Sequence, residues 1–221
     1  MLATPHQGPQ RAPDRGALRA ALSLAAKVSF GLGALCAALF VLAQTDRSVA
    51  SSAAIDAFRD VQRTALAHAP DQTTWSARRQ ADYRASLAET FDAPPGVLEI
   101  PSLKLTVPIF TGTSELVLNR GVGWIEGTAM PGEDGNVGLA GHRDGYFRSL
   151  KDLKLGDAIE VQSAGRTMRY RVSSLEIVEP TDVSVLDPTD VPSITLVTCY
   201  PFYYVGSAPQ RYIVKGSLDP T

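Results

Sequence analysis

Short segments in which hydrophobic and polar residues alternate dominate the chain after residue 96. In T-M-R-Y-R-V, the hydrophobic residues Met168, Tyr170 and Val172 alternate with polar ones, which is the two-residue period of a half-buried strand. Six further segments are rich in β-branched and aliphatic residues: V-L-E-I, L-T-V-P-I-F, N-V-G-L-A-G-H, A-I-E-V-Q-S, S-I-T-L-V-T-C-Y and R-Y-I-V-K-G. Seven strands at this spacing predict a mainly β domain, either a closed barrel or a sandwich.

The N-terminal region contains a long apolar segment. No charged residue occurs over residues 28–43, and extending the segment back to residue 20 adds one charge, Lys27, whose long side chain can extend to lipid headgroups. Arginines precede the segment, so the positive-inside rule predicts a single transmembrane helix over residues 20–43 with a cytoplasmic N-terminus. A signal peptide cleaved near Ala50 and a buried helix are the alternatives.

Two helices are predicted between the apolar segment and the β domain. The alanine-rich residues 48–69 show hydrophobic residues at helical spacing, and Pro70 would end this helix. Ser76 is a suitable N-cap for a second helix, in which every fourth residue is hydrophobic: Tyr83, Leu87 and Phe91. We interpret these helices as a spacer between membrane and β domain, with a lid or regulatory arm as the alternative.

Length and charge set limits on the organisation and on the partners. The 221 residues carry 21 basic and 23 acidic side chains, so no overall basic field indicates nucleic-acid binding. The predicted organisation is a cytoplasmic tail over 1–19, a transmembrane anchor over 20–43 in contact with membrane lipid, a helical spacer over 44–95 and a β domain over 96–221 that carries the candidate residues described next.

Three residues of the β domain are candidates for chemistry. Cys199 ends the strand T-L-V-T-C, His142 ends the strand G-L-A-G-H, and Arg211 begins the strand that follows Cys199. A hairpin could bring Arg211 back toward Cys199, although eleven intervening residues leave the register open. Taken singly, each has an ordinary interpretation: a buried inert thiol, a structural histidine and a surface arginine. The other cysteine, Cys36, lies in the apolar segment, so no disulfide is expected.

Together, these three residue types are suited to nucleophilic catalysis. A thiolate is the attacking form of cysteine, an imidazole can transfer protons near neutral pH, and a guanidinium can hold an oxyanion at any pH. The sequence has no G-x-S-x-G elbow, no H-E-x-x-H motif and no glycine-rich phosphate loop after a strand. The domain has too few histidines and cysteines for a zinc site, so we expect neither a metal nor a cofactor.

The motifs around these residues resemble the sortase family. T-L-V-T-C is similar to the sortase signature T-L-x-T-C, and Gly-His at 141–142 and Arg211 complete the family's His–Cys–Arg set in the same chain order. Wider segments resemble class D-like sortases: N-R-G-V-G-W-I-E-G-T-A-M-P-G-E at 119–133, G-N-V-G-L-A-G-H-R-D at 135–144 and T-C-Y-P-F-Y-Y-V-G-S-A-P-Q-R at 198–211. The stretches S-A-P-Q-R and W-S-A-R-R are similar to the Gram-negative branch, and the likeness covers about residues 70–218.

The resemblance implies an eight-stranded sortase-type β-barrel and a transpeptidase reaction. Cys199 would cleave the Thr–Gly bond of an L-P-x-T-G-like sorting signal through a thioacyl enzyme. His142 would act as general acid and then base, and Arg211 would hold the substrate carbonyl or the oxyanion. The backbone around Thr198 would assist with the oxyanion.

The loop between Cys199 and Arg211 should border the substrate, and Tyr203 and Tyr204 are the expected contacts in this loop. The expected partner is a secreted protein with a C-terminal L-P-x-T-G-like signal, whereas the amine acceptor stays open. The expected location is the bacterial inner membrane with a periplasmic catalytic domain. A periplasmic cysteine hydrolase and a non-catalytic, membrane-tethered binding barrel are the alternatives.

Overall fold

The computed structural model describes residues 27, 29–36, 56–67, 69–163, 165–203 and 206–219. The chain divides into two compact units, Met1–Ala50 and Ser51–Thr221. In the first unit, residues 29–36 are helical. Within the described residues, no helix has the length and apolar character needed to cross a membrane. Most of the predicted anchor over 20–43 lies outside the described residues, so the anchor stays a prediction, as do the boundaries of the tail and the spacer.

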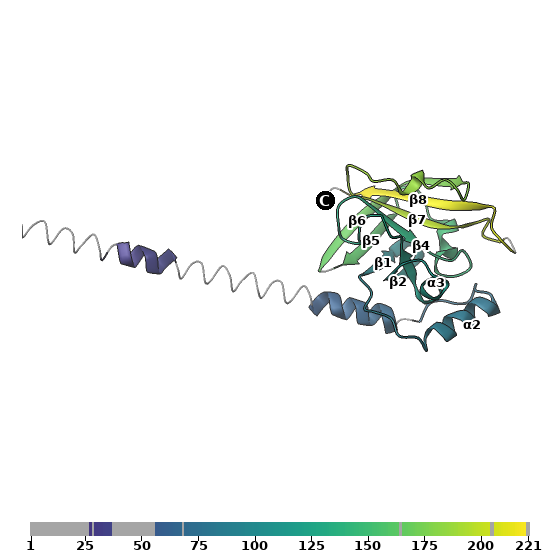
Figure 1. Cartoon of the computed structure of the whole chain (residues 1–221), viewed down its shortest axis with the longest axis horizontal. Helices are drawn as coiled ribbons and strands as arrows, with labels where there is room; N and C mark the ends of the chain where they lie inside the picture. Colours follow the sequence, from purple (N-terminus) through teal and green to yellow (C-terminus); the bar gives the residue numbers. More distant parts are fainter. Residues whose placement is uncertain are drawn as a thin grey trace, which may run out of the picture. The chain divides into compact units, whose positions relative to one another are not determined.

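Eight strands of the second unit close into a barrel in the order β1-β2-β3-β4-β7-β8-β6-β5 (Figure 1). The strand bounds are β1 Gly96–Ile100, β2 Leu105–Thr111, β3 Val122–Trp124, β4 Asn136–Ala140, β5 Ala158–Ser163, β6 Arg166–Val178, β7 Ser193–Tyr200 and β8 Gln210–Leu218. The prediction of a mainly β, eight-stranded closed barrel with short helices is therefore confirmed, and the sandwich is excluded.

Short helices connect or precede the strands. The α-helices are a segment over residues 56–67, α2 (Ala77–Ser86) and α3 (Glu115–Arg120). The 3-10 helices are η1 (Pro101–Leu103), η2 (Tyr146–Asp152) and η3 (Ser184–Leu186).

The barrel interior is filled by the hydrophobic side of each strand. Along β6, buried Met168, Tyr170 and Val172 alternate with exposed residues, as the two-residue pattern predicts. Leu98, Ile159 and Leu196 are fully buried in the same core. Each fully buried aliphatic or aromatic side chain contributes about 1.5–3 kcal/mol, so burial of this interior is the main stabilising term of the domain.

Strand β3 is the one strand that the sequence pattern did not predict. It has three residues and pairs in parallel with β2, with Val122 opposite Ile109 at the start of the pairing. A Cβ at Gly121 would lie 2.4 Å from the carbonyl oxygen of Pro108, and one at Gly123 would lie 2.2 Å from that of Gly112. The glycines that weaken the strand signal are therefore required, because only glycine permits this approach of the two backbones.

Helix α2 is packed against the domain rather than separated from it. Ser76 caps the helix as predicted, its hydroxyl accepting a hydrogen bond from the backbone N–H of Arg79 at 3.1 Å. Trp75 and Tyr83 are buried, and both make edge-on ring contacts with Tyr146 of η2, at centroid distances of 5.1 and 6.5 Å. Figure 1 shows α2 beneath the barrel. The spacer and the lid or regulatory arm therefore both stay predictions for this helix.

Candidate active site

Strand β7 carries Cys199 between two neighbouring strands, β4 and β8. The antiparallel pairing of β7 with β8 places Cys199 directly opposite Arg211. Opposite residues in such a pair have Cβ atoms about 4.5–5.5 Å apart, so the thiol and the arginine side chain begin side by side. The predicted hairpin is therefore present, and its register joins these two residues.

His142 lies on the other side of Cys199. The parallel pairing of β4 with β7 ends at Ala140 opposite Val197, and His142 and Cys199 each lie two residues further along. Two hydrogen bonds extend this pairing: Gly141 N–H donates to Val197 O at 3.1 Å, and Thr198 Oγ1 donates to Gly141 O at 2.7 Å. The structure thus brings the three predicted residues to one end of three adjacent strands.

Gly141 is needed immediately before the histidine. A Cβ at this position would lie 2.7 Å from the ring of Phe147, which is fully buried beneath it. Larger residues would displace either the ring or the backbone that leads to His142. The Gly-His pair therefore has a packing origin as well as a chemical one.

His142 is enclosed by charged residues. Its side chain is 14% exposed, and its Nε2 lies 3.3 Å from Glu115 Oε2, although this contact lacks the geometry of a hydrogen bond. Burial lowers the pKa of His142, and the positive charge of Arg79 lowers it further, whereas Glu115, Asp144 and Asp82 raise it. Burial and Arg79 outweigh the carboxylates, so the resting imidazole is neutral at neutral pH.

Arg211 is half-buried and is held by its own segment. Its Nη1 donates to Gln210 O at 3.1 Å and makes a longer contact of 3.5 Å with Ala208 O. Both acceptors are backbone carbonyls of the residues just before or at the start of β8. Since the backbone of Arg211 is paired with that of Cys199, its side chain starts from a position beside the thiol.

The predicted substrate-binding residues have different surroundings. Thr198 is only 2% exposed, and its side chain holds Gly141 in register, so any contact of this residue with substrate must come from its backbone. Tyr203 is 71% exposed, and the guanidinium of Arg148 lies 5.1 Å from its ring centroid. Tyr204 lies outside the described residues. Substrate binding by these residues stays a prediction.

Arg143 is a residue of the site that sequence reasoning missed. Its Nη1 donates to Pro201 O at 3.1 Å and its Nη2 to Gly206 O at 2.7 Å. The residue after His142 thus holds both ends of the loop that follows Cys199. No sequence pattern links Arg143 to acceptors about 60 residues away, because backbone carbonyls carry no side-chain signature.

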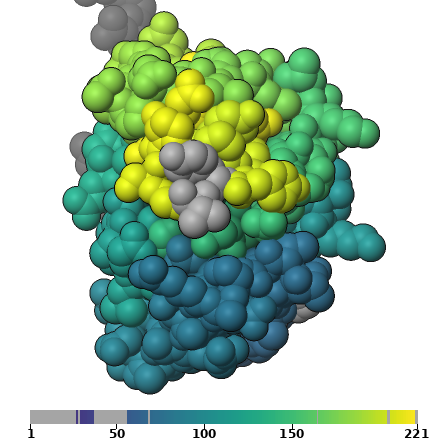
Figure 2. All heavy atoms as spheres, turned by 90° about the vertical axis from the view of Figure 1, so that its right-hand side faces the viewer, coloured from purple at the N-terminus to yellow at the C-terminus, as the bar shows by residue number. Residues whose placement is uncertain are grey.

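An aromatic cluster supports the start of the same loop. Phe202 is buried and contacts Tyr212 at a centroid distance of 5.2 Å and Tyr200 at 6.0 Å. Tyr200 and Tyr212 stack at 6.2 Å across the β7–β8 pair. Figure 2 shows a face of the domain on which green segments lie between the yellow C-terminal segment and the blue segment that contains α2.

No metal or cofactor site emerges near these residues. In the part of the chain that the structure describes, no group of three or more His, Cys, Asp or Glu residues could hold a metal ion. Both cysteines are free thiols. A cavity of about 240 Å³ lies on the other side of Gly145 and is lined by Trp75, Lys104 and Tyr146 among others, but not by Cys199, His142 or Arg211. Cys199, His142 and Arg211 supply a thiol, an imidazole and a guanidinium to the site.

Comparison with known proteins identifies the family. The family model described as Sortase domain matches residues 98–219. The chain is 36% identical over 138 residues to sortase D of Bacillus subtilis, covering 62% of this chain and 70% of that protein. It is 35% identical over 112 residues to sortase A of Staphylococcus aureus, covering 47% and 54% of the two chains.

The solved structures agree with this assignment. A Clostridium perfringens sortase D5 transpeptidase superposes with a TM-score of 0.55 at 28% identity, covering 73% of this chain and 99% of that one. Sortase A of Listeria monocytogenes gives a TM-score of 0.53 at 28% identity, covering 58% and 89%. The family model spans more than half of the chain, and the barrel carries the His–Cys–Arg set that the sequence motifs indicated. The chain therefore belongs to the sortase family of cysteine transpeptidases, with a class D-like sequence.

Proposed function

We propose that this sortase cleaves an L-P-x-T-G-like sorting signal and transfers the acyl part to an amine, with Cys199, His142 and Arg211 as its catalytic residues. The observation that carries the proposal is the position of Cys199 on β7, paired with Arg211 on β8 and next to His142 at the end of β4. Membership of an enzyme family argues against the non-catalytic barrel.

The proposed first half-reaction forms a thioester. The sulfur of Cys199 attacks the carbonyl carbon of the scissile Thr–Gly bond while its proton passes to the neutral imidazole of His142. The resulting imidazolium gives this proton to the nitrogen of the leaving glycine, and the C–N bond breaks. A lowered pKa of His142 suits both steps, because the imidazole rests neutral and its protonated form is a stronger acid.

The second half-reaction reverses the roles. The acceptor amine gives a proton to His142 as its nitrogen attacks the thioester, and the C–S bond breaks to restore the thiol. In both halves negative charge develops on the carbonyl oxygen, where the guanidinium of Arg211 would stabilise it. Water in place of the amine would give hydrolysis through the same intermediate, so the acceptor decides between transferase and hydrolase.

A peptide-transfer assay tests the proposal. We expect the full-length protein in detergent, given a library of L-P-x-T-G-like peptides and triglycine or a lysine derivative, to form a covalent adduct on Cys199. Mass spectrometry should detect this acyl enzyme and then the peptide joined to the amine. Hydrolysed peptide alone at saturating amine would make the protein a hydrolase, and the absence of an adduct with every peptide would overturn the proposal.

We propose further that residues 20–43 anchor the enzyme in the inner membrane with the catalytic domain on the periplasmic side. The uncharged run and the arginines before it support this arrangement. In cell fractionation, the protein should remain with the membranes, and mass spectrometry should detect its original N-terminal region. A new N-terminus near residue 50 in a soluble fraction would instead show that the segment is a cleaved signal peptide.

A further inference from the structure

We infer that Arg79 of helix α2 is a positioning residue for the reaction, which holds the loop carrying His142 and thereby keeps the imidazole next to Cys199. The inference rests on the proposed role of His142. Helix α2 precedes the segment that the family model matches, residues 98–219, so this contribution comes from outside the matched domain.

The guanidinium of Arg79 joins three segments of the chain. Its Nε donates to Asp144 Oδ1 at 3.1 Å, and its Nη1 donates to Asn119 Oδ1. Asp144 lies two residues after His142, and Asn119 lies in α3. The Arg79 side chain is only 13% exposed. A charge buried to this extent is stable only while its partners are in place, so the contact fixes the loop relative to α2 and α3.

Arg79 also lies close to the histidine itself. A Cβ built at Gly145 would lie 3.4 Å from His142 Cβ and 3.6 Å from Arg79 Cδ, so both side chains border the same small space. The loop is a tight turn, in which Gly145 N–H and Phe147 N–H both donate to His142 O, at 3.1 and 3.2 Å. A shift of Asp144 away from Arg79 would therefore move His142.

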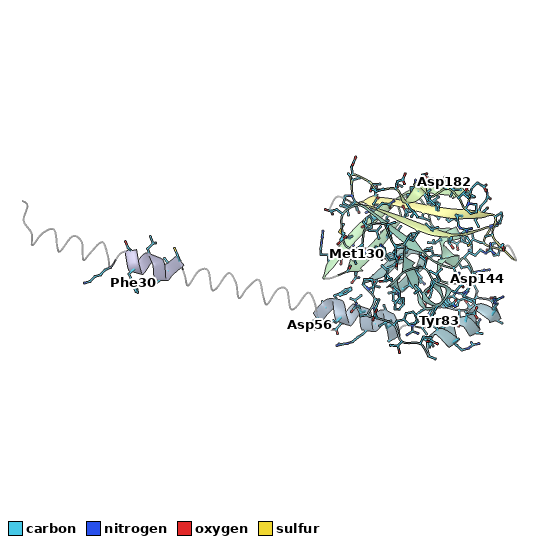
Figure 3. All side chains as sticks on the ribbon, viewed as in Figure 1. Phe30, Asp56, Tyr83, Met130, Asp144 and Asp182 are labelled. Carbon is cyan, nitrogen blue, oxygen red and sulfur yellow. The ribbon has the colours of Figure 1, made fainter. Side chains whose placement is uncertain are left out.

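Helix α2 is anchored well enough to serve as the support. Ser76 caps it at the turn that carries Arg79, and the rings of Trp75 and Tyr83 pack against Tyr146. The Tyr146 hydroxyl donates to Arg120 O at 3.1 Å, at the end of α3. In Figure 3, Tyr83 on α2 and Asp144 in the loop above it lie at the same end of the domain.

Charges from every neighbouring element act on His142. Burial lowers the pKa of His142 and Arg79 is the second cause, whereas three carboxylates raise it. The charged groups that act on it are Arg79 and Asp82 on α2, Glu115 on α3 and Asp144 in the loop itself. Cys199 and Arg211 lie on the adjacent strands β7 and β8. Without Arg79, only burial would oppose the carboxylates of Asp144, Glu115 and Asp82, so the pKa of His142 would rise. The protonated imidazole would be attracted toward these carboxylates and away from the thiol.

Two substitutions, one that removes a positive charge and one that removes a negative charge near His142, test the inference. In Arg79→Met, the pKa of His142 should rise, so the acidic limb of the pH profile of kcat/KM should move to higher pH. The value of kcat should fall about 10- to 100-fold with little change in KM, since the loss is one of geometry at the reacting group. In Asp144→Asn, one of the carboxylates that oppose Arg79 is lost, so the pKa of His142 should fall. General destabilisation could not move the pKa in both directions.

Matched variants and a direct titration complete the experiment. Arg78→Met changes the preceding residue, whose side chain is 93% exposed, and should behave as the wild type. Arg79→Lys should recover part of the kcat lost in Arg79→Met. NMR titration of the His142 ring, assigned with His142→Gln, measures the pKa in the Cys199→Ala background. If Arg79→Met fails to fold, the direction of the shift in Asp144→Asn decides.

The outcomes separate this inference from the proposed function. An unchanged His142 titration and wild-type kcat in Arg79→Met would overturn the role of Arg79 and leave the role of Cys199 intact. Transfer activity in Cys199→Ala would overturn the proposed function, whereas the titration would still report whether Arg79 and Asp144 set the state of His142.

Discussion

Replacing Cys199 by alanine is expected to abolish both peptide cleavage and amine transfer. In the proposed reaction the sulfur of Cys199 forms the thioester, and the other cysteine, Cys36, belongs to the Met1–Ala50 unit. Removing the nucleophile from a covalent acyl-transfer enzyme costs on the order of 10⁶-fold in kcat. Mass spectrometry of the products formed from a sorting peptide and an amine gives the measurement. Because Cys199 is only half-buried, alanine should leave the barrel folded.

The matched control for this variant is Cys36→Ala, which should keep full activity. A methanethiosulfonate reagent should modify Cys199 and stop the reaction in both the wild type and Cys36→Ala. A Cys199→Ala protein that still joins peptide to amine would contradict the assignment of the nucleophile. Loss of activity in Cys36→Ala alone would place the essential thiol in the N-terminal unit.

The sequence predicted most of the barrel because its long strands have clear periodicity. Alternation along Met168, Tyr170 and Val172 corresponds to β6, and the apolar run before Cys199 corresponds to β7. Strand β3 was not predicted because it is three residues long and lies among glycines that its parallel pairing requires. Closure of the barrel also depends on pairings between segments far apart in the chain, such as β1 with β5. The hydrophobic periodicity of a single segment does not encode such pairings.

The site was predicted in its residues but not in its geometry. Chain order and residue type pointed to Cys199, His142 and Arg211, yet the register that pairs Cys199 with Arg211 depends on the conformation of the intervening loop. Arg143 could not be predicted as a support of that loop, because its partners are backbone carbonyls of Pro201 and Gly206.

Helix α2 was predicted correctly as a helix but interpreted mainly as a spacer. The predicted spacing of Tyr83, Leu87 and Phe91 extends past the helix, which ends at Ser86, so only Tyr83 of the three lies in it. Such spacing is equally typical of a spacer and of a packed arm. Arg79 is the residue that connects the helix to the loop of His142, but in the sequence it is one of several arginines on a polar helix. Its partners Asn119 and Asp144 lie 40 and 65 residues away, so its role depends on tertiary structure.

Arg211→Lys is expected to lower kcat by about 10²- to 10³-fold, the usual cost of losing one oxyanion donor. Lysine keeps the positive charge but lacks the planar fork that can contact two oxygen positions from one strand position. Since the backbone of residue 211 is paired with Cys199, the change alters the donor at the thiol and little else. Steady-state kinetics with the sorting peptide gives kcat and KM separately, and a thermal melt reports on folding.

The division of the effect between kcat and KM distinguishes the two roles proposed for Arg211. A donor that contacts only the developing oxyanion lowers kcat when it is removed and leaves KM unchanged, whereas a donor that already binds the ground-state carbonyl raises KM. The present hydrogen bonds of Arg211 to Gln210 O and Ala208 O favour the first result, because the guanidinium must exchange these acceptors as charge develops. Arg171→Lys on the adjacent strand β6, where the arginine pairs with Asp219 at 2.9 Å, is the control and should leave both constants unchanged. A loss of less than about threefold in Arg211→Lys would show that another donor, such as the backbone near Thr198, stabilises the oxyanion.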